Sequence, residues 1–208
     1  MGKVIGGLTV LLVVLMSPVV MVAAAFGGMA STTHTGSSSE LIAQLQAAGH
    51  SNGRLPDVAL TVVSERSGYR CRVARVGGAD LAWGSLVEAA ATQGVVIEGG
   101  WCYRTFEEQA AAWNRRRCFV PGNCDGNPYP PTARPGTSVH GWGMAVDVWG
   151  ASGLLGCASS EFHWLQVFAP RYGWVHPDWA ACGEAGAEPW HWEYVGTGLT
   201  GSTRGDDT

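Results

Sequence analysis

The spacing of apolar residues along the chain predicts one amphipathic helix and three buried strands. The helix is expected over ADLAWGSLVEAAATQG, residues 79–94, with Gly94 as its stop. Four apolar residues share one face of it: Leu81, Leu86, Val87 and Ala90. The runs VVIEGGW, MAVDVW and WHWEY (95–101, 144–149 and 190–194) are rich in β-branched and aromatic residues, which favours strands.

Capping residues and charge placement predict further helices. Ser37 and Glu40 form a capping-box pair ahead of LIAQLQAAGH, and Thr105 caps TFEEQAAAWNRRR, which has acids in its first turn and arginines in its last. Another helix is expected around SSEFHWLQVFAPRYG, residues 159–173. Since helices and strands mix without regular βαβ alternation, the pattern predicts an α+β fold, with a small antiparallel sheet flanked by helices.

Four segments are predicted along the chain. Residues 1–30 form an apolar leader, with no charge after Lys3, and residues 31–52 form a polar linker with a short helix. Residues 53–195 form the folded domain, and the tail, 196–208, has no apolar pattern and is expected to be disordered. Inside the domain, residues 118–137 hold five prolines and three glycines, so they form a long loop of the kind that often borders a functional site.

The leader predicts that the domain is exported. Its uncharged stretch, residues 4–30, is longer than the about 7 to 15 residues of a typical signal-peptide core, and long enough to span a bilayer. Cleavage and retention as an N-terminal membrane anchor both stay open, and the membrane is a partner only if the segment is not cleaved. No Lys or Arg lies between Lys3 and Arg54, so the positive-inside rule places the domain outside the cytoplasm in either case.

Charge and cysteine content narrow the function further. A formal net charge of −4 argues against a nucleic-acid partner. The six cysteines are an even number, which in an exported chain predicts up to three disulfides, with Cys118 and Cys124 the easiest pair to join.

The chemistry of the chain centres on Asp147, a carboxylate inside a predicted buried strand. A buried carboxylate is costly unless it is paired, hydrogen-bonded or metal-bound. His140 is its natural partner, and His191 lies in a second predicted strand, three residues after Glu188. Two histidines and an aspartate leave a fourth position for water, which is the composition of a catalytic zinc site, with Glu188 placed to act as general base. The simpler alternative is a hydrogen-bonded core pair beside an ordinary strand histidine.

Two motifs carry a resemblance to a known family. Ser138, His140, Gly143, Ala145 and Asp147 match every position of the pattern S-x-H-x-x-G-x-A-x-D, and E-x-W-H follows at 188–191. With these motifs the chain resembles the LAS zinc peptidases (lysostaphin, D-Ala-D-Ala carboxypeptidases, sonic hedgehog), and most of all their VanY-like D-alanyl-D-alanine carboxypeptidase branch. The similarity runs from about residue 55 to residue 194, and includes WCYRTFEEQ, where Cys102 stands in place of the usual glycine.

The resemblance implies a LAS/hedgehog-like fold and a role for each matching residue. His140, Asp147 and His191 would bind one Zn²⁺ per chain, and Glu188 would be the catalytic base. Arg104 would stabilise the oxyanion, and the substrate contacts would come from Ser138 and Gln109.

We therefore expect an exported zinc metallopeptidase whose partner is a peptidoglycan stem peptide, and whose reaction is removal of the terminal D-Ala. Two alternatives stay open at this point: an L-Ala-D-Glu type cell-wall endopeptidase, and a zinc-bearing domain of hedgehog-like type that binds without hydrolysing. Glu188 and Arg104 favour an enzyme, because a binding module needs neither a base nor an oxyanion partner.

Overall fold

Seven strands lie within the residues that this computed structural model describes, which are Gly2, 38–124 and 132–196. β1 (Leu60–Arg66) and β2 (Tyr69–Ala74) pair antiparallel in a sheet of their own. The other strands form a second antiparallel sheet in the order β3-β4-β7-β6, with β5 paired to β4. Their bounds are Ile97–Trp101 for β3, Ala145–Gly150 for β4, Gly153–Leu154 for β5, Trp174–Val175 for β6 and His191–Tyr194 for β7.

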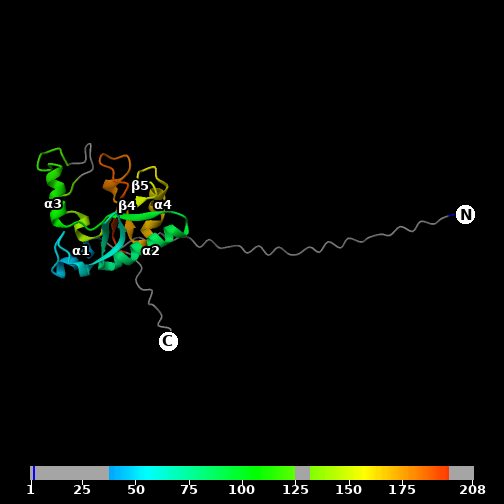
Figure 1. Cartoon of the computed structure of the whole chain (residues 1–208), viewed down its shortest axis with the longest axis horizontal. Helices are drawn as coiled ribbons and strands as arrows, with labels where there is room; N and C mark the ends of the chain where they lie inside the picture. Colours follow the sequence, from blue (N-terminus) through cyan, green and yellow to red (C-terminus); the bar gives the residue numbers. More distant parts are fainter. Residues whose placement is uncertain (1, 3–37, 125–131, 197–208) are drawn as a thin grey trace, which may run out of the picture. The chain divides into compact units, whose positions relative to one another are not determined.

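Helices pack around these sheets, as Figure 1 shows with α3 at one side, α4 at the other, and β4 and β5 between them. The α-helices are α1 (Ser38–Ala47), α2 (Ala79–Thr92), α3 (Phe106–Arg115) and α4 (Ser160–Phe168). Thr105 caps α3 in a full capping box with Glu108, as the sequence indicates. The predicted α+β class with a small antiparallel sheet is therefore confirmed.

The β1–β2 hairpin is an element that the sequence pattern did not reveal. Its turn is the pair Ser67-Gly68, both with positive φ (49° and 80°), which is the backbone of a tight two-residue hairpin turn. Ser-Gly is a recognised turn signal. Arginines interrupt the apolar alternation of β2, so the strand itself was hard to recognise.

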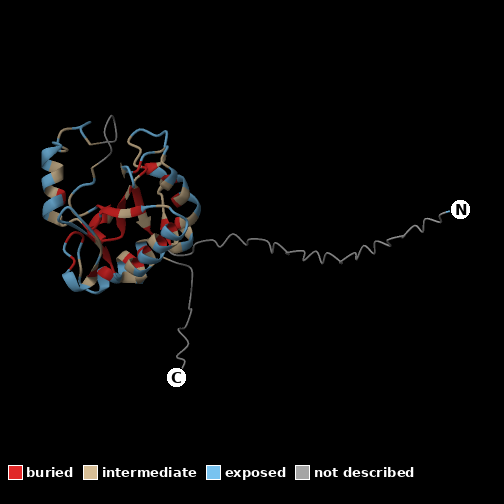
Figure 2. Ribbon diagram, turned by 45° about the vertical axis from the view of Figure 1, so that its right-hand side comes forward, coloured by how far each residue is buried: buried red, intermediate tan, exposed pale blue. Residues whose placement is uncertain are grey.

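The core lies between α2, α4 and the larger sheet, where Figure 2 shows buried residues concentrated on the central strands. Trp83 of α2 is 1% exposed and packs edge-to-face on Trp174 of β6, with ring centroids 5.2 Å apart. The prediction that Leu81 belongs to the buried face is wrong, since it is 75% exposed. The buried face of α2 instead follows Ala79, Trp83, Leu86 and Ala90, a spacing of three and four residues that leaves out Leu81.

The helix predicted in the linker belongs to the core. Leu41 and Leu45 of α1 are both less than 10% exposed, and they join the same hydrophobic cluster as the strands. Gly77 lies so close to Leu41 that an added Cβ would stand 2.6 Å from its Cδ2. The folded unit therefore reaches back at least to Ser38.

Other segment predictions fall outside the described residues, namely the leader, residues 1–30, and the tail beyond residue 196. Within the part of the chain that the structure describes, no helix has both the length and the apolar character that crossing a bilayer requires. The export prediction therefore stays a prediction.

All six cysteines pair, which confirms the expectation of three disulfides. The bonds join Cys118 to Cys124, as predicted, Cys71 to Cys102, and Cys157 to Cys182. The last two connectivities could not be read from the sequence.

The packing of α2 predicts a strong contrast between two substitutions on one helix. Trp83→Ala should lower the free energy of unfolding by about 3–5 kcal/mol, because it removes a fully buried indole. Leu81→Ala, at an exposed position, should change it by no more than about 0.5 kcal/mol. Urea unfolding followed by circular dichroism measures both, and equal losses would mean that the helix is packed on a different face.

Candidate metal centre

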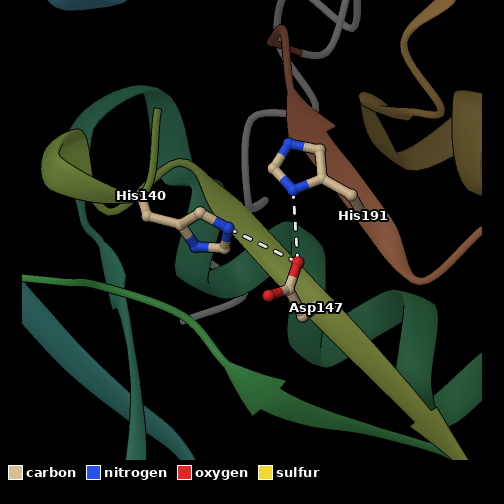
Figure 3. A group of neighbouring side chains, drawn as sticks. All are labelled: His140, Asp147 and His191. Atoms are coloured by element: carbon tan, nitrogen blue, oxygen red, sulfur yellow. Dashed lines mark hydrogen bonds and ion pairs between the residues drawn. The ribbon is translucent and has the colours of Figure 1, made fainter. Parts of the chain in front are cut away.

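Asp147 and His191 meet because their strands are neighbours. β4 and β7 pair antiparallel, and these two residues are direct register partners. Their side chains therefore project from the same face of the sheet. Figure 3 shows both side chains and His140 pointing toward one another.

His140 reaches the same point from the short 3-10 helix Val139–Trp142, just before β4. Gly141 permits this approach, because its backbone packs against the side chain of Asn52 with no room for a Cβ. The side-chain amide of Asn52 donates to the carbonyl of Ser138 at 2.7 Å and so fastens the turn. Gly143, at φ 66°, then lets the chain enter β4.

The three side chains have the geometry of a metal site. Nε2 of His140 and Nδ1 of His191 lie 3.4 and 3.2 Å from Oδ1 of Asp147, and one ligand atom from each residue lies within 4.8 Å of the others. All three residues are 4–5% exposed. Two imidazole nitrogens and one carboxylate oxygen are ligands that Zn²⁺ accepts, so the residues fit the predicted ion.

The second nitrogen of each imidazole is also engaged. Nδ1 of His140 donates to the carbonyl of Cys102 at 2.8 Å, and Nε2 of His191 donates to Oε1 of Glu193 at 3.0 Å. Each contact fixes the tautomer that turns the other nitrogen toward Asp147, which is the usual outer arrangement around a metal-binding histidine. Sequence analysis missed Glu193, although its place two residues after His191 on one strand puts both on the same face.

Burial and charge act on these groups in opposite directions. Burial favours the neutral form of Asp147, but the two histidines outweigh it and hold its pKa well below the ordinary value of 3.8. Burial lowers the pKa of His140 below 6.5. For His191 burial also acts to lower the pKa, yet the hydrogen bonds to Asp147 and Glu193 prevail and raise it to about 9.

Glu188 lies beside the cluster, as predicted. Its Oε2 is 3.8 Å from Nδ1 of His191, and its side chain is 13% exposed. Burial, the largest cause, raises the pKa of Glu188 to about 7, with Asp147 adding to the rise. A carboxyl group with a pKa near neutrality can both accept and release a proton.

Arg104 and Gln109 occupy different places. Arg104 lines the same cavity as Glu188, and its Nη1 donates to Oε1 of Gln109 at 2.9 Å. Gln109 is 2% exposed, and its amide donates to the carbonyl of Ala133 at 2.6 Å. It lies behind Arg104, whereas Ser138 lines the cavity directly.

A cavity of about 920 Å³ contains the cluster and offers room for a peptide. Trp101, Trp179 and Trp190 line it, and Trp179 packs on His191 with ring centroids 4.9 Å apart. Of the tryptophans named by their closeness to the motifs, Trp192 is a core residue, 1% exposed. Arg115 and Arg116 from the end of α3 give the cavity further positive charge.

A buried His-Asp-His cluster at a cavity, with a carboxyl group of raised pKa beside it, is the arrangement of a catalytic zinc site. Fold and site thus define a zinc metallopeptidase. The family model "VanY: D-alanyl-D-alanine carboxypeptidase" matches residues 77–197, so the chain belongs to the VanY family.

Known proteins similar to this chain agree. A D-alanyl-D-alanine carboxypeptidase of Enterococcus faecalis (strain ATCC 700802 / V583) is 30% identical over 122 residues, which are 53% of this chain and 44% of that protein. The chain thus spans less than half the length of this relative.

Solved structures show the same fold. The LdcB LD-carboxypeptidase is 23% identical with a TM-score of 0.54, over 71% of this chain and 76% of that one. A VanY D,D-pentapeptidase mutant from a VanB-type resistance cassette, in complex with Zn(II), is 23% identical with a TM-score of 0.48, over 71% and 87%.

The shifted pKa of His191 predicts how the metal-free protein responds to pH. Its folded-state pKa, about 9, exceeds the ordinary 6.5, so the stability from its ion pairs is complete below pH 6.5 and is lost as pH rises through 9. Zinc affinity should rise over the same interval, because the ion displaces the Nδ1 proton. Calorimetry in a chelator between pH 6.5 and 9 measures the first effect, and a His191→Gln variant should lose most of the slope.

Proposed function

We propose that this protein is an exported zinc carboxypeptidase that removes the terminal D-Ala from peptidoglycan stem peptides. The observation that carries the proposal is the joint placement of Glu188 and Arg104 in the cavity that holds the His-Asp-His cluster. A zinc-bearing domain that only binds would need neither group there.

His140, Asp147 and His191 would hold the zinc ion through Nε2, Oδ1 and Nδ1. When bound, Zn²⁺ supplies a Lewis acid that polarises the scissile carbonyl and makes water a nucleophile near neutral pH. Glu188, with its pKa near 7, accepts the proton of the attacking water and returns it to the leaving amine.

Arg104 provides fixed positive charge where the carbonyl oxygen becomes negative. Its guanidinium is always protonated, and Gln109 holds it from behind at 2.9 Å. A charge that is already oriented costs no reorganisation during the reaction, which is the source of its catalytic effect. In this proposal Gln109 acts through Arg104, and Ser138 contacts the substrate.

The substrate class and the location rest on other support. The family to which the chain belongs is that of D-alanyl-D-alanine carboxypeptidases. Three disulfides suit a protein that works in an oxidising compartment outside the cytoplasm, where peptidoglycan is found. Tryptophans in the cavity offer apolar surface to the methyl groups and backbone of a short peptide.

The first prediction from this proposal separates metal binding from catalysis. Glu188→Gln should retain zinc yet lose about 10²–10⁴-fold in kcat, because it removes the base and leaves the ligands in place. His140→Ala should lose zinc and activity together. Zinc content by elemental analysis and turnover of a D-Ala-D-Ala peptide measure these effects. Glu184→Gln, an exposed acid of the same segment, is the control, and near-normal turnover by Glu188→Gln would refute the base assignment.

The second prediction concerns the bond that is cut. Digestion of pentapeptide-containing muropeptides should release a single D-Ala and leave a tetrapeptide, as mass spectrometry can show. Release of a D-Ala from a tetrapeptide, or cleavage between L-Ala and D-Glu, would contradict the D,D-carboxypeptidase assignment and leave the zinc site in place.

A further inference from the structure

The three residues between β3 and α3 connect the metal site to the smaller sheet. On one side they hold His140 twice, since the carbonyl of Cys102 accepts from its Nδ1 at 2.8 Å and the amide of Arg104 donates to its carbonyl at 3.1 Å. Both the ring and the backbone of this metal ligand thus depend on where residues 102–104 lie.

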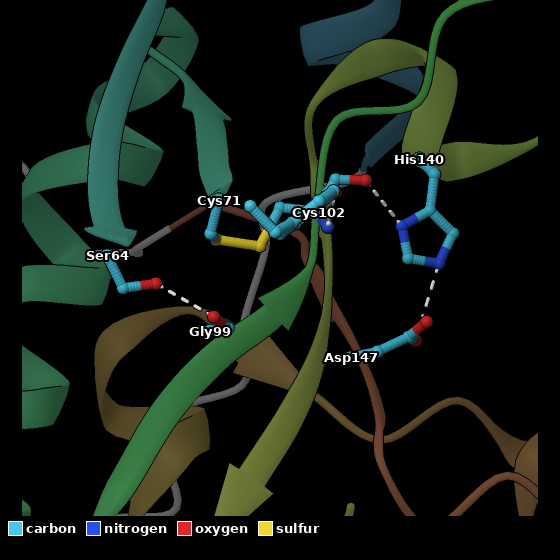
Figure 4. The surroundings of a disulfide bond; sticks show 7 residues. Ser64, Cys71, Gly99, Cys102, His140 and Asp147 are labelled. Carbon is cyan, nitrogen blue, oxygen red and sulfur yellow. Dashed lines mark hydrogen bonds and ion pairs between the residues drawn. A yellow bond between two sulfur atoms is a disulfide. The ribbon is translucent and has the colours of Figure 1, made fainter. Parts of the chain in front are cut away.

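On their other side the same residues are fastened to β2. The disulfide joins Cys102 to Cys71, with Cα atoms 5.0 Å apart, and both cysteines are at most 1% exposed. The amide of Cys102 donates to the hydroxyl of Tyr69 at 3.2 Å, and the amide of Tyr103 donates to the carbonyl of Arg72 at 2.9 Å. Figure 4 shows the disulfide, the Cys102 carbonyl, His140 and Asp147 in one continuous chain of contacts.

The larger sheet gives this segment little support. Pairing between β3 and β4 is irregular after Gly99 and ends at the partners Trp101 and Asp147, so Cys102 lies beyond the ladder. Gly99 leaves space for the disulfide, because an added Cβ would stand 2.5 Å from the sulfur of Cys71. The contacts from β2 therefore decide where the Cys102 carbonyl points.

We propose that the Cys71–Cys102 disulfide is a positioning element of the metal site, which acts by fixing the Cys102 carbonyl that orients His140. This inference rests on the proposed zinc site. An outer hydrogen bond of this kind sets the ring orientation of a ligating histidine, and its loss typically weakens metal binding by about 10–100-fold.

The test compares two disulfides in the full-length protein. Cys71→Ala/Cys102→Ala should weaken the zinc dissociation constant at least about 10-fold, measured by competition with a chelator of known affinity, and should alter the visible spectrum of the Co²⁺-substituted protein. Cys157→Ala/Cys182→Ala opens a loop of similar length, with a separation of 25 residues against 31, and so removes a similar chain constraint. This control should keep the zinc affinity and the Co²⁺ spectrum of the unaltered protein.

Each outcome bears on the inference. Unchanged affinity in the Cys71→Ala/Cys102→Ala variant, or an equal loss in both variants, would overturn it, the second because it would mark a general effect of stability. If the first variant does not fold, Tyr69→Phe decides, since it removes one contact to Cys102 and keeps the disulfide: weaker zinc binding supports the inference and unchanged binding overturns it. Absence of zinc from the unaltered protein would refute the proposed function itself.

Discussion

The site depends on one physical constraint, the cost of keeping the carboxylate of Asp147 charged in the interior. At 5% exposure it has almost no access to water, and the two imidazoles that flank its Oδ1 replace that solvation. A divalent cation would do so more completely, and would at the same time remove the need for a proton on His191. The same burial that makes the metal-free cluster depend on protonated histidine thus prepares it to bind a metal.

Two acids in one cavity are driven to opposite behaviour by their surroundings. Asp147 lies between two histidines and stays ionised, whereas Glu188 is mainly desolvated and has a pKa near 7. Environments that separate two carboxyl groups in this way assign one to a permanent charge and the other to proton transfer. The proposed division between a ligand and a base is therefore built into the fold.

The support of the site extends well beyond the three ligands. Glu193 fixes one histidine from within its own strand, and the carbonyl of Cys102 fixes the other from a segment braced by β2. Gly141 and Gly143 matter here for close packing and a turn, which is why a side chain at either position would displace His140. The β1–β2 hairpin, remote from the motifs in sequence, thereby gains a part in the geometry of the cavity.

The sequence by itself predicted the α+β class, the helix boundaries set by Thr105 and Gly94, and the convergence of His140, Asp147 and His191. These follow from local capping, from strand alternation and from the cost of an unpaired acid, all of which can be read along the chain. Only the tertiary structure could decide that Trp83 and not Leu81 faces the core, that Gln109 stands behind Arg104, and that a backbone carbonyl orients His140. Such contacts join residues far apart in the chain, and a carbonyl oxygen, being the same for every residue type, leaves no trace in the sequence.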